Sequence, residues 1–181
     1  FMRERVGSMG GITIPISIEK IVSGGQTGVD RAALDVAMLL DIPHGGWCPR
    51  GRLAEDGRIP DRYELRECES AEYFVRTERN VEDSDGTLIL HRGRLTGGTA
   101  LTSRYARRRK RPCLKIDLAL AQRSLRGMTK FEDFEAWRAQ HNIRVLNVAG
   151  PRASSCPEIY EDAREWLLAA LEQARPARPK E

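Results

Sequence analysis

The sequence has no long apolar run and few of the residues that build metal centres. No stretch approaches the ~20 consecutive apolar residues of a membrane-spanning helix, so we expect no role in a bilayer. The first fifteen residues carry charge but no apolar segment of the secretory type, which predicts a cytoplasmic protein. The four cysteines form no CxxC pair and only three histidines are present, so we expect no zinc site or histidine-rich metal site.

The rest of the composition is typical of one globular domain. Hydrophobic residues make up 40% of the 181 positions and charged residues 31%, a mixture that excludes a largely disordered chain. We expect a flexible extension over residues 1–15, a single domain over residues 16–173 and a flexible tail over residues 174–181. The net charge of +4 is mild and does not by itself indicate nucleic-acid binding.

Strand and helix patterns alternate along most of the chain. Apolar, β-rich runs occur at residues 18–23, 86–90, 113–118 and 143–148, and stretches with helical spacing at residues 29–40, 72–82 and 100–109. Capping-box spacings at Thr129–Glu132 and Ser155–Glu158 predict the starts of two further helices. This alternation predicts a Rossmann-like three-layer α/β/α fold with a mainly parallel open sheet of about five strands. Such sheets bind ligands at the carboxyl ends of their strands.

The turn after the first strand is the first candidate ligand site. It consists of Ser23, Gly24, Gly25, Gln26, Thr27 and Gly28, directly before a helix. Glycines permit a tight turn and a close approach of a ligand to the backbone. The free N–H groups of a first helical turn carry partial positive charge, which suits an oxyanion. The turn matches neither GxGxxG nor the P-loop pattern, so no nucleotide motif is present. The alternative is a structural turn in which Thr27 caps the helix.

Two later strands end in similar turns. The first of these consists of Thr96, Gly97, Gly98 and Thr99, with two hydroxyl groups as additional donors. The second, residues 150–155, offers one arginine and two serine hydroxyls, and a structural cap explains it equally well. We expect the N–H groups of residues 25–28 and 97–99 to donate to one oxyanion if these turns meet at the same edge of the sheet.

A long loop over about residues 45–62 adds charged side chains, and long loops in compact domains are usually functional. Arg50 or Arg52 would neutralise an anionic ligand, because guanidinium groups bind oxyanions bidentately. In an enzyme that cleaves an N-glycosidic bond, Glu55 or Asp56 would be the acid or the nucleophile. The alternative for the loop is a solvated, charged segment without a ligand role. Cys48, beside the loop, is either a reactive thiol or an ordinary half-buried cysteine.

The basic run from Arg104 to Arg111 lies at the carboxyl end of an expected helix, where the helix dipole favours cations. No array of aromatic residues accompanies it, as single-stranded nucleic acid would require. A solvated helix end, or a surface for an acidic protein, is therefore the preferred interpretation.

Four blocks of the sequence carry a family resemblance. They are residues 21–35, residues 48–52 with 54–57, residues 80–81 with 84–89, and residues 97–99 with Thr102. Together they resemble the molybdenum cofactor carrier proteins of the Rossmann-like SLOG superfamily, over about residues 18–171. This superfamily also contains the lysine-decarboxylase-like, cytokinin-activating phosphoribohydrolases. The resemblance implies a homo-oligomer, a dimer or tetramer, that binds molybdenum cofactor (molybdopterin) or an oxyanion such as molybdate or tungstate. It also implies delivery to a molybdoenzyme or a partner in cofactor biosynthesis.

One departure from the hydrolase pattern favours a binding protein over an enzyme. Thr102 stands where the hydrolase relatives carry their catalytic glutamate, and residues 94–96 replace their proline and glycines. A phosphoribohydrolase-like enzyme and a nucleotide-sensing module stay open as alternatives, and we expect neither nucleic-acid nor membrane partners. The candidate ligand-binding residues are Ser23, Gly24, Gly25, Gln26, Thr27, Gly28, Arg50, Arg52, Glu55, Asp85, Thr96, Gly97, Gly98, Thr99 and Thr102, with no catalytic or metal-ligating residue.

Overall fold

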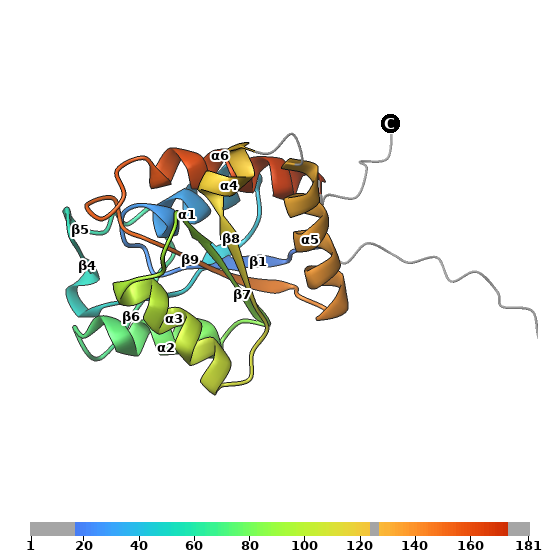
Figure 1. The fold of residues 1–181 in the computed structure, drawn as a ribbon. Helices are drawn as coiled ribbons and strands as arrows, with labels where there is room; N and C mark the ends of the chain where they lie inside the picture. Colours follow the sequence, from blue (N-terminus) through green and yellow to red (C-terminus); the bar gives the residue numbers. More distant parts are fainter. Residues whose placement is uncertain (1–16, 124–126, 174–181) are drawn as a thin grey trace, which may run out of the picture.

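A five-stranded parallel sheet forms the centre of the molecule (Figure 1). The computed structural model describes residues 17–123 and 127–173, so the expected extension (1–15) and tail (174–181) lie outside the described residues. The strands are β1 (Lys20–Val22), β2 (His44–Gly45), β7 (Gly86–His91), β8 (Cys113–Asp117) and β9 (Val145–Ala149). Their order is β2-β1-β9-β7-β8, and every pairing is parallel. The predicted Rossmann-like fold is confirmed.

Apolar sequence places β7 inside the sheet. Residues 86–90 are all buried, as expected for a strand covered on both faces. β9, the last strand along the chain, pairs with β1 on one side and with β7 on the other. The sheet is therefore completed only after the last strand is inserted between strands that precede it in sequence.

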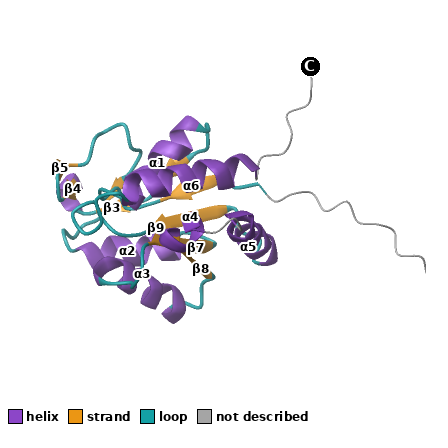
Figure 2. Ribbon diagram, turned by 45° about the horizontal axis from the view of Figure 1, so that its top comes forward, coloured by secondary structure: helices purple, strands orange, loops and turns teal. Residues whose placement is uncertain are grey.

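Helices cover both faces of the sheet. α1 (Val29–Leu39) and α6 (Ile159–Gln173) pack together on one face, and α2 (Tyr73–Glu82) and α3 (Gly97–Arg108) on the other (Figure 2). The predicted apolar stripe of α1, which includes Ala33, Val36 and Ala37, is buried in the main core. No helix of the described ranges is long and apolar enough to span a membrane.

Both predicted capping boxes are wrong. Thr129 lies inside α5, which spans Gly127–Gln140, and α6 begins at Ile159 rather than just after Ser155. The N–H groups of Ser155 and Cys156 instead donate to the carbonyl of Arg152 (3.0 and 3.1 Å), which forms a separate turn before the helix. A capping pattern in sequence does not exclude such a competing local turn.

A short helix follows β8 where the sequence pattern extended the strand. This helix, α4, spans Leu118–Arg123. Asp117 Oδ1 accepts a hydrogen bond from the N–H of Ala119 (3.0 Å). Asp117 therefore ends the strand and caps the start of the helix.

The long loop folds into small paired segments with a core of its own. β3 (Trp47–Cys48) pairs with β6 (Arg66–Glu67), and β4 (Leu53–Ala54) pairs with β5 (Gly57–Arg58) around the short helix η1 (Arg50–Arg52). The buried side chains of this second core are Leu34, Cys48, Ile59, Tyr63 and Leu65. Burial raises the pKa of the Cys48 thiol above its usual range, so Cys48 is a packing residue and not an activated nucleophile.

Candidate functional site

A cavity of about 300 Å³ lies at the carboxyl ends of β1, β7 and β9. Residues from all three strand-end turns line it: Gly24 and Gln26 after β1, Thr96–Thr99 after β7, and Gly150–Arg152 after β9. The strand order puts β1, β9 and β7 side by side, and parallel strands end at the same edge of a sheet. The three turns singled out in the sequence therefore meet at one cavity.

Helix α2 forms a further wall, which the sequence analysis missed. Tyr73, Arg76, Thr77 and Asn80 all line the cavity. Their spacing of three, four and seven residues places them on one side of the helix. The helical spacing of these polar and aromatic residues could have predicted that they share one side of α2. It did not show that this side faces the cavity.

A buried ion pair lies in this wall. Arg76 Nη1 donates to Asp30 Oδ2 (2.9 Å), and Asp30 also accepts the N–H of Gln26 (3.3 Å). A Cβ at position 24 would stand 1.5 Å from Arg76 Nη1, so Gly24 leaves the space that the guanidinium occupies. Arg76 Nε is buried and has no hydrogen-bond partner among the described residues. The pair thus offers an unused donor in a group that lines the cavity.

The two charges of this pair depend on each other. Burial raises the pKa of Asp30 above its ordinary value of 3.8, whereas Arg76 and the N–H of Gln26 act in the opposite direction. Burial disfavours the ionised carboxylate, so Arg76 is the main group that favours it.

The N-terminus of α3 is open to the cavity. Its N-cap residue, Thr96, makes no side-chain capping hydrogen bond, and the first-turn N–H groups of a helix have no partner within the helix. Gly97 has a φ of +51°, and a Cβ at Gly97 or Gly98 would meet no atom within 4 Å. Bare backbone therefore faces open space at this helix start.

The N-terminus of α1 differs, because the protein itself uses its amide groups. The N–H of Gln26 donates to Asp30, that of Thr27 to Gln26 Oε1 (3.0 Å), and that of Val29 to the carbonyl of Pro151 (3.2 Å). The predicted donation from these turn amides to a ligand is therefore not supported at residues 26 and 27. The amides of α3 remain as the better donors.

Four further residues of the first turn do not line the cavity. Ser23 Oγ donates to the carbonyl of Val148 (2.8 Å) and so joins β1 to β9. A Cβ at Gly25 would stand 2.5 Å from Leu65, and one at Gly28 would stand 2.3 Å from the carbonyl oxygen of Pro151. Thr27 Oγ1 contacts Glu55. These residues pack the turn against its surroundings.

Arg50 and Arg52 lie outside the cavity lining, contrary to expectation. Arg52 is buried, and its guanidinium donates to the carbonyl oxygens of Ile59, Leu65, Pro60 and Tyr63 at 2.9–3.2 Å. Arg50 is exposed. The cationic groups of the cavity lining are instead Arg76 and Arg152. Arg52 cross-links the loop: four of its five guanidinium N–H groups are used, and the one that is left cannot make a bidentate ligand contact.

Glu55 also lies outside the cavity lining and joins two loops. Its carboxylate accepts the N–H of Ser154 (3.0 Å), contacts the hydroxyls of Thr27 and Ser154, and lies 3.5 Å from Arg152 Nε. Desolvation acts to raise the pKa of Glu55, but the hydrogen bonds from Ser154 and Thr27 outweigh it and hold the pKa below its usual 4.5. The neighbouring Asp56 is paired with Arg31. Neither carboxylate is placed to attack a ligand in the cavity.

Replacing Glu55 with glutamine should lower the free energy of unfolding by about 1 kcal/mol, because a charged acceptor shared by two loops is lost. The depressed pKa of Glu55 means that its contribution to stability is present above pH 4.5 and is lost as the pH falls through the folded-state pKa. Urea unfolding between pH 3 and 7 measures both effects. An identical pH dependence in wild type and variant would contradict this assignment.

Asp85, by contrast, lies at the opposite edge of the sheet. Its Oδ2 accepts the N–H groups of Arg144 (3.0 Å) and Val145 (2.7 Å), where β7 and β9 begin. The carboxylate therefore sets the register of two strands and is remote from their carboxyl ends. No group of His, Cys, Asp and Glu side chains in residues 17–123 and 127–173 is arranged to hold a metal ion.

Thr99 and Thr102 are buried residues of the cavity wall. Thr102 Oγ1 donates to the carbonyl of Gly98 one turn earlier (2.9 Å). Thr102, which the family resemblance aligns with the catalytic glutamate of the hydrolases, thus makes a hydrogen bond within helix α3.

A parallel sheet with helices on both faces and a turn-lined cavity at the carboxyl ends of its strands defines a Rossmann-like domain. More particularly, the chain belongs to the circularly permutated YpsA SLOG family, whose model matches residues 21–171. The chain is also similar to a solved structure, a "putative molybdenum carrier protein" from Syntrophus aciditrophicus SB, with 48% sequence identity and a TM-score of 0.82. The match covers 89% of this chain and 99% of that one. No curated protein matches. The family resemblance predicted from the sequence is confirmed.

Proposed function

We propose that the protein carries molybdenum cofactor or a related cargo with an oxyanion group, bound in the cavity at the carboxyl edge of the sheet. One observation carries the proposal: Arg76, whose buried Nε has no hydrogen-bond partner among the described residues, lines the same cavity as the open N-terminus of α3. Guanidinium and first-turn amide groups together form a strong site for a phosphate or metal-oxo group.

The size of the cavity and the structural neighbour support a cargo with an organic body. A volume of about 300 Å³ lies at the lower end of the range for organic ligands and exceeds what a bare tetrahedral oxyanion fills. The neighbour's name supports a molybdenum-containing cargo. We extend the proposal to a cytoplasmic homo-oligomer that delivers its cargo to a molybdoenzyme or a cofactor-biosynthesis protein.

The distribution of carboxylates supports binding over hydrolysis. Asp30 is the one acidic residue among those that line the cavity in the described ranges, and its carboxylate is paired with Arg76. Cleavage of an N-glycosidic bond by a carboxylate requires one that is free to act as the acid or the nucleophile. Glu55 and Asp56, the earlier candidates for these roles, are held by other contacts.

Replacing Gly98 with aspartate should reduce affinity for phosphate and tungstate at least about tenfold, because a carboxylate at the start of α3 repels an anion. The side chain has room, since a Cβ there meets no atom within 4 Å, and an acidic residue in a first helical turn stabilises the helix. Calorimetric titration of the two anions, and protection of added molybdenum cofactor from oxidation, measure the effect.

Gly98→Asn is the matched control, because it adds a side chain of the same shape without the charge. It should keep most of the wild-type affinity. Equal affinity in wild type and Gly98→Asp would contradict the placement of the oxyanion. Turnover of nucleoside monophosphates, or a rise in melting temperature with AMP but not with tungstate, would replace the carrier by a hydrolase or a nucleotide sensor.

A further inference from the structure

Tyr73 is an exposed aromatic residue at the mouth of the cavity. It lines the cavity, yet 45% of the residue remains accessible to solvent. Exposed tyrosine rings on a ligand cavity are suited to stacking, because they present a large rigid face at a small cost in entropy. The hydrogen bonds described for the cavity wall do not involve its ring.

The arrangement of helices α2 and α3 places Tyr73 near the protein groups that are proposed to bind the oxyanion. Arg109, just after α3, pairs with Glu78 (2.6 Å) and Glu82 (2.8 Å) of α2, so the carboxyl ends of α2 and α3 lie together. The two helices pack side by side (Figure 1), and their first turns, with Tyr73 and Gly98, therefore lie together at the cavity.

The ring of Tyr73 also adjoins Arg76. Arg76 Cζ lies 5.9 Å from the centroid of the Tyr73 ring. The neighbouring wall at Gly97 and Gly98 has no side chain and faces open space. A ligand whose oxyanion is bound by Arg76 would therefore extend the rest of its body past a flat aromatic face on one side and bare backbone on another.

We propose that Tyr73 determines specificity at this site, because it stacks on a flat heterocycle, of the pterin or purine type, that the phosphate-bearing cargo carries. This inference rests on the proposed function, because the oxyanion of the same ligand positions the ring. Tyr73 then determines which phosphate-bearing molecules are retained, while Arg76 and α3 bind the phosphate common to all of them.

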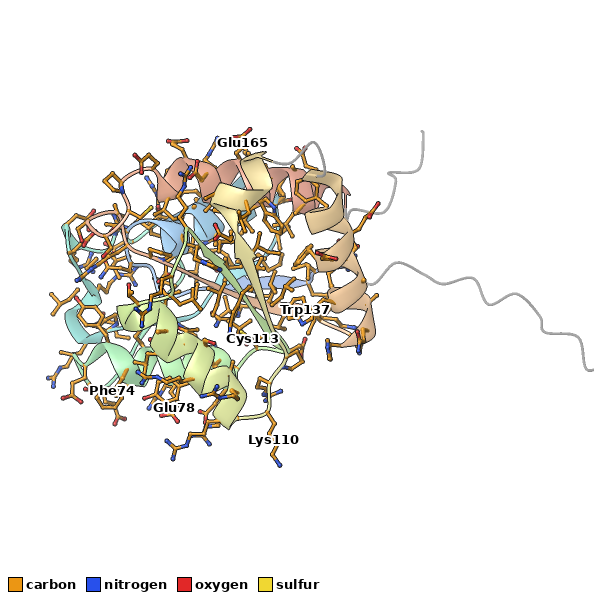
Figure 3. All side chains as sticks on the ribbon, in the orientation of Figure 1. Phe74, Glu78, Lys110, Cys113, Trp137 and Glu165 are labelled. Carbon is orange, nitrogen blue, oxygen red and sulfur yellow. The ribbon has the colours of Figure 1, made fainter. Side chains whose placement is uncertain are left out.

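Phe74 provides a matched control. It is as exposed as Tyr73, at 44%, but it does not line the cavity. Figure 3 shows Phe74 on the outer side of the molecule, at the start of α2. Removal of either ring deletes a similar exposed aromatic surface, so an effect specific to Tyr73 is an effect on the cavity.

The test compares four probes: 6-hydroxymethylpterin monophosphate, AMP, ribose 5-phosphate and inorganic phosphate. Wild type, Tyr73→Ala, Tyr73→Phe and Phe74→Ala are titrated with each by calorimetry. We expect wild type to bind at least one of the two ring-bearing phosphates about tenfold or more tightly than ribose 5-phosphate, the contribution of one stacked base. Tyr73→Ala should abolish that preference and leave the affinity for ribose 5-phosphate unchanged, while Tyr73→Phe and Phe74→Ala should retain it.

The outcomes separate this inference from the proposed function. If Tyr73→Ala still prefers the ring-bearing phosphates, the role of Tyr73 is overturned and the proposed function is not. The same follows if wild type binds ribose 5-phosphate but shows no preference for the ring-bearing phosphates. Failure of every phosphate probe to bind wild type overturns the proposed function and the inference with it. Preference for AMP over the pterin phosphate supports stacking by Tyr73 but overturns molybdenum cofactor as the cargo.

Discussion

Replacing Arg76 with glutamine should lower the free energy of unfolding by about 3–5 kcal/mol, the usual cost of leaving one member of a buried ion pair without its partner. Asp30, which Arg76 contacts at 2.9 Å, would keep a buried carboxylate without its cationic partner, although the N–H of Gln26 would still donate to it. Affinity for phosphate should fall at the same time, because the unused Nε of Arg76 is lost. Urea unfolding and calorimetric titration measure the two effects.

The double variant Arg76→Gln/Asp30→Asn is the control, since it removes both charges and should recover much of the stability but none of the phosphate affinity.

The effect of Arg76→Gln on stability also depends on pH. The raised pKa of Asp30 means that the folded state retains this proton more strongly than the unfolded state, so ionisation costs stability as the pH rises from 3.8 through the folded-state pKa. Arg76→Gln should therefore be more destabilising at pH 7 than at pH 4. Equal destabilisation at both, with no recovery in the double variant, would contradict the role of the pair.

The second large effect is expected at Arg52. Arg52→Ala should destabilise the protein by at least about 3 kcal/mol, because four carbonyl oxygens lose a charged donor and the loop loses its cross-link. Arg52→Lys should recover little, since one ammonium group cannot reach the carbonyls that a guanidinium spans. Thermal unfolding of both variants measures this.

Arg50→Ala is the matched control two residues away, and its exposed side chain should contribute within about 0.5 kcal/mol. If Arg52 instead bound the cargo, Arg52→Lys would keep its stability and lose part of its anion affinity. That result would restore the ligand role expected from the sequence.

Strong periodicity made much of the fold predictable. The continuous apolar run at residues 86–90 predicted the buried strand β7, and the spacing of Ala33, Val36 and Ala37 predicted the buried side of α1. The capping box at Ser155 failed because a competing local turn forms there, and the one at Thr129 failed because α5 begins earlier, at Gly127. Periodicity sums over many residues, whereas a cap depends on one or two contacts.

The site was predictable only in part, for a different reason. Glycine turns such as Gly97–Gly98 can be recognised in sequence, because their backbone requirement is local. The role of an arginine is not local. Arg52 lies in a conspicuous charged loop but binds backbone carbonyls, whereas Arg76, in an ordinary amphipathic helix, borders the cavity. The sequence shows which residues are charged, but it does not show which groups these residues contact in the folded protein.

The sequence by itself determined the parallel α/β class, the helices that follow the glycine turns, and the family. Each of those features is carried by patterns of residues that are close along the chain, and the family by four such blocks. Only the tertiary structure decided that β9 inserts between β1 and β7, and that α2 brings Tyr73 and Arg76 to the turns after these strands. The physical reason is that strand order and helix placement come from burying apolar surface shared by distant segments, which no local pattern encodes.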